Sequence, residues 1–282
     1  MSGKSGITSV PWRLLPSPPA SGARNMALDQ ALLESAVRDG FRPTLRFYRW
    51  SPAALSLGRF QSVDDVDLEA CAAKGIDVVR RPTGGKSILH SGDFTYSIVF
   101  PPGSGMPDGV VDAYRVICRG ILRALEILGI DADVLTREGD DYRSAGGACF
   151  AASTRADLEC AGRKLCGSAQ VRRHGAILQH GSILLEDHSE LLYELLRFAD
   201  DENRGRQLRN FRSRCMSLDE TGCRRSWSEV ADAFRRGFAD AFQAVLEEGG
   251  LSAEEGKRAD DLTGAYLSPQ WLYNPESRAF PR

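Results

Sequence analysis

Lysine is scarce in this chain of 282 residues. The chain carries 36 basic residues, of which five are lysine and the rest arginine; the lysines are Lys4, Lys74, Lys86, Lys164 and Lys257. Because this chain uses arginine wherever any cation would serve, each lysine is a candidate for a specific role. An excess of basic charge is also missing, since 38 acidic residues leave a net charge of −2. A nucleic-acid partner is therefore not expected, because binding phosphates requires a clear basic excess.

Paired cysteines and long apolar runs are missing as well. The seven cysteines are an odd number and contain no CxxC pair, which argues against a secreted disulfide framework and against a structural zinc site. No window approaches the roughly 18 apolar residues of a membrane span, and the N-terminus has no signal-peptide core. We therefore expect a cytoplasmic protein with reduced thiols, no bound metal and no membrane partner.

The composition that remains is that of a globular protein, with 42% hydrophobic and 26% charged residues. Helical and strand patterns alternate along the chain, and the strands come as hairpin-like neighbours. This predicts an α+β (mixed α/β) fold. We expect a flexible Ser-, Pro- and Gly-rich leader over residues 1–22, a catalytic domain over 23–220 and a helical C-terminal segment over 221–282.

Several elements have local signals. Asn25 is a candidate cap for a helix that Gly40 would end. Residues 164–172 and 176–185 predict a hairpin around 173–175, whereas residues 136–148 are expected to form a loop. Ser226 and Glu229 have the spacing of a capping box, which predicts a helix behind them.

The motif RRPTGGKS over residues 80–87 resembles a phosphate-binding loop only superficially. A Walker A loop needs a glycine where Arg80 stands, so this interpretation fails. The pair Gly84-Gly85 could still let backbone approach a ligand, and the alternative is a plain β-turn.

Cys149 is the best candidate for a reactive thiol. It follows the Gly-rich loop, whereas Cys71, Cys118 and Cys160 are better explained as small buried apolar residues. A nearby cation lowers the pKa of a thiol, and Lys164 on a predicted strand could supply that charge.

Five ordered motifs between residues 24 and 185 carry a family resemblance. They are NMALDQALLE, PTLRFYRWSPAALSLGRFQ, RRPTGGKSILHSGDFTYSIVFP, ACF and GRKLCGSAQVRRHGAILQHGSI, with a weaker echo at YLSPQW over 266–271. In these motifs the chain resembles the biotin/lipoate protein ligase superfamily and, within it, the cysteine-dependent octanoyltransferases of lipoate assembly. The resemblance implies a mixed sheet flanked by helices, as in biotin ligase catalytic domains.

The resemblance also implies a reaction. Cys149 would take the octanoyl group from octanoyl-acyl carrier protein as a thioester and pass it to a lysine of a lipoyl domain, typically the glycine-cleavage H protein. Lys164 would lower the thiol pKa and polarise the acyl carbonyl. No cofactor is implied, because the donor thioester is already activated. The residues expected to bind substrate are Arg80, Gly84, Gly85, His90, Gly167, Ser168 and His180.

Other functions stay open at this point. An ATP-dependent lipoate ligase would use Lys164 to hold an acyl-adenylate, and a sibling amidotransferase would move octanoate from the H protein to other lipoyl domains. A non-catalytic paralogue would only bind such partners. Related proteins often carry His-Asp where this chain has His90-Ser91, and Arg or Gly where it has Lys86, so acyl specificity follows less directly than the reaction class. The arginine cluster within 204–214 is expected to contact an acidic carrier protein.

Overall fold

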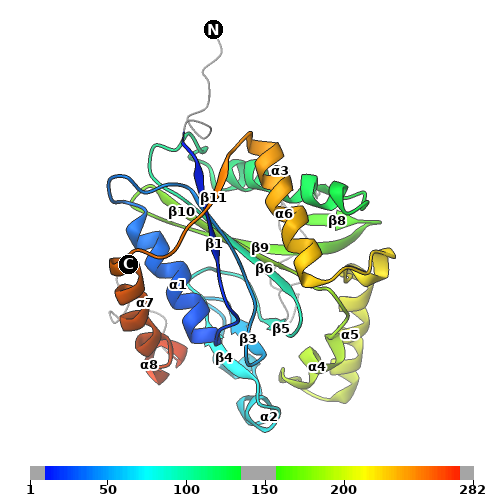
Figure 1. Ribbon diagram of the computed structural model, residues 1–282. Helices are drawn as coiled ribbons and strands as arrows, with labels where there is room; N and C mark the ends of the chain where they lie inside the picture. The colour runs from blue at the N-terminus through cyan, green and yellow to red at the C-terminus, as the bar shows by residue number, and fades with distance from the viewer. Residues whose placement is uncertain (1–9, 135–156, 274–282) are drawn as a thin grey trace.

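The computed structural model describes residues 10–134 and 157–273 and is built around an eight-stranded mixed sheet. The strand order is β11-β1-β2-β6-β10-β9-β8-β7 (Figure 1). The strands are β1 (Trp12–Pro16), β2 (Thr44–Tyr48), β6 (Phe94–Phe100), β7 (Asp133–Val134), β8 (Leu158–Cys160), β9 (Arg163–Arg173), β10 (Ala176–Ile183) and β11 (Leu246–Glu248). β1 runs parallel to β2 and β11, and the other neighbours pair antiparallel. The predicted fold class is confirmed.

A second, three-stranded sheet lies beside the large one. It consists of β4 (Asp77–Arg80), β3 (Ala54–Leu57) and β5 (Ile88–His90), with β3 in the centre. The neighbouring short elements are η2 (Val63–Asp65), α2 (Leu68–Ala73), α4 (Ser189–Glu194), α5 (Asp201–Arg214) and η4 (Asp219–Thr221). Leu55 of β3, Cys71 of α2 and Phe211 of α5 share one apolar core, so this group of elements packs as a unit.

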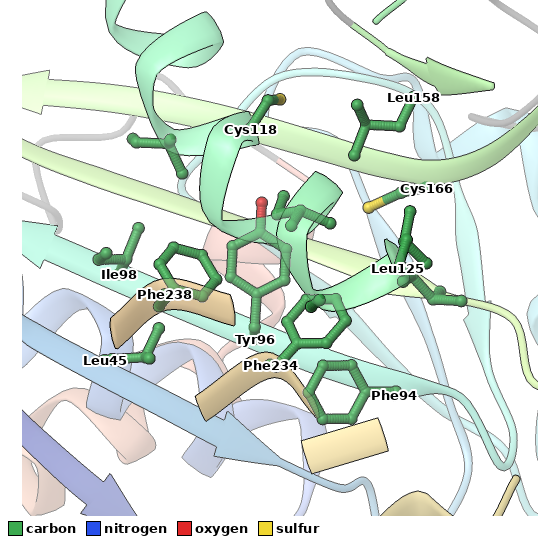
Figure 2. Close-up of a cluster of buried hydrophobic side chains, with 14 of the residues drawn as sticks. Leu45, Phe94, Tyr96, Ile98, Cys118, Leu125, Leu158, Cys166, Phe234 and Phe238 are labelled. Atoms are coloured by element: carbon green, nitrogen blue, oxygen red, sulfur yellow. The ribbon is translucent and has the colours of Figure 1, made fainter. Parts of the chain in front are cut away.

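Helices cover both faces of the large sheet. α3 (Val110–Ile127) and α6 (Trp227–Phe242) lie on one face, while α1 (Gly22–Ser35), α7 (Ala253–Tyr266) and α8 (Pro269–Tyr273) lie on the other (Figure 1). β6 shows why, because its aromatic residues Phe94 and Tyr96 point into the core beneath α6 (Figure 2), whereas Thr95 and Ser97 point to the side of α1. None of the helices that the structure describes is long and apolar enough to cross a membrane.

The two ends of the described chain differ from the sequence-based expectation. Residues 12–16 fall in the expected flexible leader, but they form β1, because Trp12 and Leu15 are buried. The expected C-terminal segment supplies not only helices but also β11, which pairs with β1 at the edge of the sheet. Trp12 packs edge-on against Phe100 and tilted against Phe242, so one aromatic cluster ties β1 to β6 and to α6. The domain boundaries at residues 22 and 220 stay predictions.

Local signals were reliable at some positions and wrong at others. The capping box of Ser226 and Glu229 is present, and the predicted hairpin turns at His174 and Gly175, which both have positive φ. The start of α1 was predicted wrongly, because Ser21 caps it. Asn25 is instead buried and donates its side-chain amide to two backbone carbonyls. The expected loop 136–148 lies outside the described residues.

Prediction: replacing Gly237 with alanine destabilises the fold. Gly237 lies where α6 crosses α3, and a Cβ there would be 2.5 Å from the backbone nitrogen of Ala124 and 2.7 Å from the carbonyl oxygen of Gly120. Backbone cannot move aside as a side chain can, so we expect Gly237→Ala to lower the free energy of unfolding by about 1–3 kcal/mol in urea melts. The control is Gly264→Ala on α7, where a Cβ would meet nothing within 4 Å and should stabilise the helix. Equal effects of both substitutions would contradict this packing argument.

Candidate active site

A narrow cleft lies between the two sheets and the start of α1, with about 350 Å³ of space that includes its opening to solvent. Its polar lining includes His90 of β5 and His180 of β10, and its apolar lining includes Met26, Trp50 and Ile88. The remaining lining residues are Tyr48, Ser56, Arg81, Thr95, Gly167, Ser168, Ala169, Gly181 and Ser182. A small-molecule site typically has this mixture of apolar walls with few polar groups.

Four of the predicted substrate-binding residues line this cleft. They are His90, Gly167, Ser168 and His180, which come from three strands of two sheets. The other three, Arg80, Gly84 and Gly85, do not belong to its lining. Arg80 is 1% exposed and donates to the backbone oxygens of Gly58, Arg59, Gln61 and Leu272. Its guanidinium thus joins a loop to α8, which is a structural role.

The backbone at Gly84-Gly85 lies close to another segment of the chain, and the predicted approach to a ligand stays a prediction. A Cβ on Gly58 would lie 1.9 Å from the carbonyl oxygen of Gly85, so the 58 loop and the 84–85 turn fit together only because residue 58 is glycine. Arg81 holds the turn from inside by donating to the carbonyls of Gly84 and Lys86, at 2.8 Å each. These contacts give the turn a fixed shape beside the cleft.

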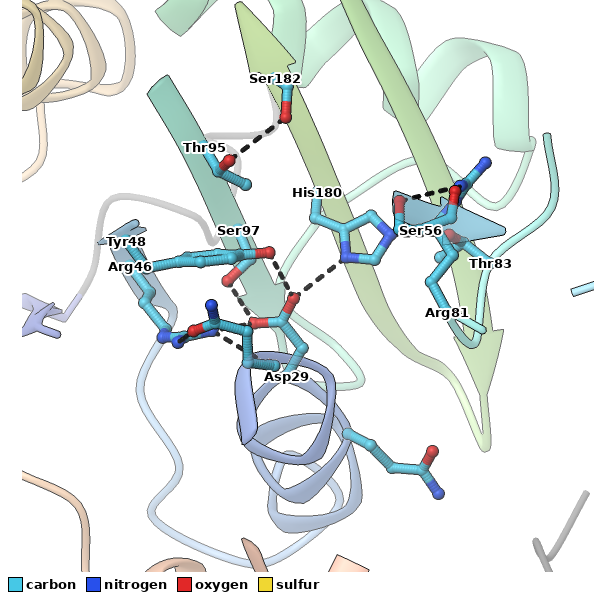
Figure 3. A network of polar contacts seen from close by, with 12 residues as sticks. Asp29, Arg46, Tyr48, Ser56, Arg81, Thr83, Thr95, Ser97, His180 and Ser182 are labelled. Carbon is cyan, nitrogen blue, oxygen red and sulfur yellow. Dashed lines mark hydrogen bonds and ion pairs between the residues drawn. The ribbon is translucent and has the colours of Figure 1, made fainter. Parts of the chain in front are cut away.

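Beneath the cleft, Asp29 of α1 is the centre of a buried polar network (Figure 3). Its carboxylate accepts hydrogen bonds from Arg46 at 2.8 Å, Ser97 at 2.8 Å and Tyr48 at 3.1 Å. Burial alone would raise the pKa of Asp29, but the Arg46 guanidinium and the hydrogen bonds outweigh it and hold the pKa below its usual value. Ionised Asp29 therefore stabilises the fold above about pH 4, the ordinary pKa of aspartate in an unfolded chain.

The same carboxylate fixes the tautomer of His180. Nδ1 of His180 lies 3.0 Å from Oδ2 of Asp29, and Nε2 lies 2.6 Å from Oγ1 of Thr83. Burial lowers the pKa of His180, so the ring is neutral and its one proton sits on Nδ1, facing the carboxylate. Nε2 then accepts a hydrogen bond from the Thr83 hydroxyl, which ties the 80–87 motif to the sheet.

His90 is held in a parallel way. Its Nδ1 lies 2.8 Å from Oδ2 of Asp93, its Nε2 lies 2.9 Å from Oγ of Ser56, and its ring stacks on Trp50 with centroids 3.9 Å apart. Asp93 thus supplies a buried carboxylate that orients the His90 ring, although Ser91 directly follows the histidine.

Lys164 is buried on β9 three residues before the cleft residue Gly167. Its ammonium forms an ion pair with Asp157 at 2.9 Å, and both side chains are at most 5% exposed. Cys149, predicted as its partner, lies outside the described residues, so the predicted Cys149–Lys164 contact stays a prediction. Cys166 in the same motif is not a reactive thiol, because burial raises its pKa to about 12.

Sequence analysis did not single out several residues that line the cleft. Thr95 and Ser182 are small polar residues that face each other on the neighbouring strands β6 and β10. The only signal for Thr95 is the alternation of polar with aromatic residues in β6. Gly181 is required because a Cβ there would lie 2.3 Å from Oγ of Ser168. Asp29 has no local signal, since its partners come from three other elements. Within residues 10–134 and 157–273, no group of three or more His, Cys, Asp or Glu residues could hold a metal ion.

The fold and this cleft define a class of protein. The chain belongs to the family of lipoyl protein ligase A/B catalytic domains, whose family model matches residues 21–239.

Curated relatives are similar over nearly the whole chain. The octanoyltransferase LipM of Kyrpidia tusciae is 43% identical over 270 residues, which cover 93% of this chain and 98% of that protein. LipM of Geobacillus kaustophilus is 41% identical over 271 residues, and LipM of Bacillus subtilis is 38% identical over 271 residues. Each alignment covers 93% of this chain and 98% of the relative.

Solved structures of lipoate ligases share the fold. The bi-partite lipoate protein ligase of Thermoplasma acidophilum, described together with its E2 lipoyl domain, matches with a TM-score of 0.81 and 26% identity over 95% of this chain and 98% of that one. A lipoate-protein ligase A bound with ATP matches with a TM-score of 0.77 and 25% identity over 94% and 99%.

Prediction: Asp29→Asn costs about 3–5 kcal/mol of unfolding free energy, because it leaves the buried Arg46 guanidinium without a counter-charge. Arg46 and Asp29 are both 0% exposed. The control is Asp260→Asn, which removes an ion pair to Arg24 whose acidic partner is 73% exposed and should cost less than about 1 kcal/mol. Chemical unfolding at neutral pH measures both. If the two variants lost similar stability, the Asp29 network would not be the constraint described above.

Proposed function

We propose that this protein is an octanoyltransferase of lipoate biosynthesis that works through a thioester on Cys149. The observation that carries the proposal is similarity to octanoyltransferases at 36–43% identity over nearly the full chain. The cleft supports it, because it has apolar walls, where each buried CH₂ of an octanoyl chain contributes about 0.8 kcal/mol.

The proposed reaction has two half-reactions. The Cys149 thiolate attacks the thioester carbonyl of octanoyl-acyl carrier protein, so a new carbon–sulfur bond forms and the carrier thiol leaves and takes up a proton. A lysine amine of a lipoyl domain then attacks the enzyme thioester. An amide forms, the carbon–sulfur bond breaks, and the proton lost by the amine restores the Cys149 thiol.

Two thiols in the apolar core beneath α3 and α6 are poor alternatives to Cys149. Burial raises the pKa of Cys118 well above its usual value, and that of Cys166 to about 12, so neither forms a thiolate at neutral pH. Lys164 is the proposed cation for the Cys149 thiolate and for the developing charge on the acyl carbonyl. An arginine would not replace it, because a planar guanidinium does not act as a compact point charge.

The proposed carrier partner has a candidate contact on α5. This helix carries five arginines, and its far end is joined to the Lys164 strand, since the backbone N–H of Met216 donates to the Lys164 carbonyl at 3.0 Å. Arg204 pairs with Asp201, and Arg212 pairs with Asp187 and Glu190. Arg206 and Arg209 are exposed, and neither forms an ion pair within the part of the chain that is described. We propose that this pair attracts the acidic carrier protein.

Prediction: incubation with octanoyl-acyl carrier protein adds the mass of one octanoyl group to the protein, on the peptide that contains Cys149. Cys149→Ser should abolish the adduct, and the control Cys223→Ser, at a half-buried thiol, should leave it unchanged. Offering free lipoate with ATP, or octanoyl-H protein, in place of the carrier distinguishes a ligase and an amidotransferase. An adduct that persists in Cys149→Ser, or transfer only from lipoate with ATP, would refute the proposed mechanism.

Prediction: Arg206→Glu combined with Arg209→Glu raises the KM for octanoyl-acyl carrier protein severalfold at low salt and leaves kcat nearly unchanged. The effect should shrink as salt screens the attraction. Arg235→Glu combined with Arg236→Glu makes the same charge change on α6 and should alter KM little. Steady-state kinetics at two salt concentrations provide the measurement. A KM that stays at the wild-type value at low salt would exclude this surface.

A further inference from the structure

The hairpin of β8 and β9 places Lys164 by means of an irregular register. The turn consists of Ala161 and Gly162, which have φ values of 50° and 73°, as in the tight turns that suit hairpin twist. From the turn, Cys160 pairs with Arg163 and Glu159 with Lys164. The next pair is Leu158 with Cys166, so Leu165 is an extra residue in β9.

This bulge decides which way Lys164 points. In a regular strand Lys164 and Cys166 would share a face, because side chains alternate with a period of two. Cys166 and Leu158 both lie in the apolar core beneath α3 and α6. The extra residue places Lys164 opposite Glu159 instead, on the face that carries His180 and the cleft. A regular hairpin would direct the ammonium into the apolar core.

Asp157 forms a buried ion pair with Lys164. The Nζ–Oδ2 distance is 2.9 Å, with side-chain exposures of 5% for Lys164 and 1% for Asp157. A buried ammonium is costly without a counter-charge, and a buried pair that loses one partner leaves the other charge uncompensated. The pair therefore keeps a charged lysine at a place where an isolated lysine would tend to lose its proton.

We propose that Asp157 is a positioning residue for octanoyl transfer, which holds the Lys164 ammonium charged and directed to the cleft side of the sheet. The role rests on the proposed function, in which Lys164 supports the Cys149 thiolate and the acyl carbonyl. Asp157 itself acts only through Lys164. It exchanges no proton with the substrate and forms no bond to the acyl group.

The titratable groups that interact electrostatically with Asp157 are Tyr114 and Cys118 of α3 and Cys166 of β9, which belong to the apolar core on the other face of the sheet. Burial raises their pKa values, so they stay neutral across the assay range and do not obscure the pH profile. Glu159 and Arg163 flank Lys164 on the hairpin, and Cys215 bridges to it through backbone. Glu159 is the matched control, because it is a carboxylate directly across from Lys164 that does not form the buried pair.

The test measures single-turnover formation of the octanoyl adduct from octanoyl-acyl carrier protein between about pH 6 and about pH 9. Asp157→Asn should slow adduct formation about tenfold at neutral pH, with a deficit that grows as the pH rises, because a buried ammonium loses its proton more easily once the Asp157 carboxylate is removed. Asp157→Glu should recover part of the rate. Glu159→Gln should match the wild type.

A double-mutant cycle separates positioning from a merely structural role. In a Lys164→Gln background, adding Asp157→Asn should cause little further loss, because the two residues act through one cation. Losses that multiply, or a wild-type rate in Asp157→Asn at every pH, would overturn the proposal. If Asp157→Asn does not fold, the same cycle with Asp157→Glu decides. A wild type that forms no adduct overturns the proposed function and this role with it, whereas a normal wild-type adduct with a normal Asp157→Asn rate overturns this role alone.

Discussion

The buried ion pair between Arg46 and Asp29 is the constraint on which the site depends. Both charges are fully removed from water, so every oxygen and nitrogen of the pair needs a partner inside the protein. The partners of Asp29 come from β2, β6 and β10, while Asp29 itself is on α1. One carboxylate therefore fixes a helix relative to three strands, and the cleft lies directly above this junction. Displacing any of these elements would leave a charge unsatisfied, which keeps the floor of the cleft in one arrangement.

Buried hydrogen bonds also fix the walls of the cleft, through two histidines. His180 contacts Asp29 with one ring nitrogen and Thr83 with the other. His90 likewise contacts Asp93 and Ser56, and the Ser56 hydroxyl also accepts a hydrogen bond from Arg81. Both histidines are thus linked to the turn that follows Arg80. Because Arg81 and His180 already hold that turn by hydrogen bonds, the proposed acyl chain would not have to order it on entry. Apolar contacts with Met26, Ile88 and Trp50 would then contribute to affinity without that entropic cost.

Much of this could be predicted from sequence where the signal is local or where a motif carries it. The capping box at Ser226 and the turn at His174-Gly175 follow from neighbouring residues alone. The motifs singled out His90 and His180, and the structure places both in the lining of the cleft. The motif predicts that Arg80 binds substrate. The structure shows its guanidinium donating to the carbonyl of Leu272, a contact that no local pattern reveals. β11, with two glutamates in three residues, is a strand only because β1 offers it an edge. Asp29 and Asp157 are ordinary acidic residues in sequence, and only tertiary contacts give them their roles.

The comparisons with ligases and transferases indicate how one scaffold serves two chemistries. This chain shares its fold with lipoate ligases at 25–26% identity and resembles octanoyltransferases more closely. Under the proposed function, both activities would need a place for a medium-length acyl chain and a cation near its carbonyl, and we propose the cleft and Lys164 for these two roles. What would differ is how the acyl group is activated, through an adenylate or a thioester. Lys164, paired with Asp157 on a bulged strand, would serve either route. A lysine suits that place in a chain that otherwise prefers arginine, because its ammonium is a compact point charge and a planar guanidinium is not.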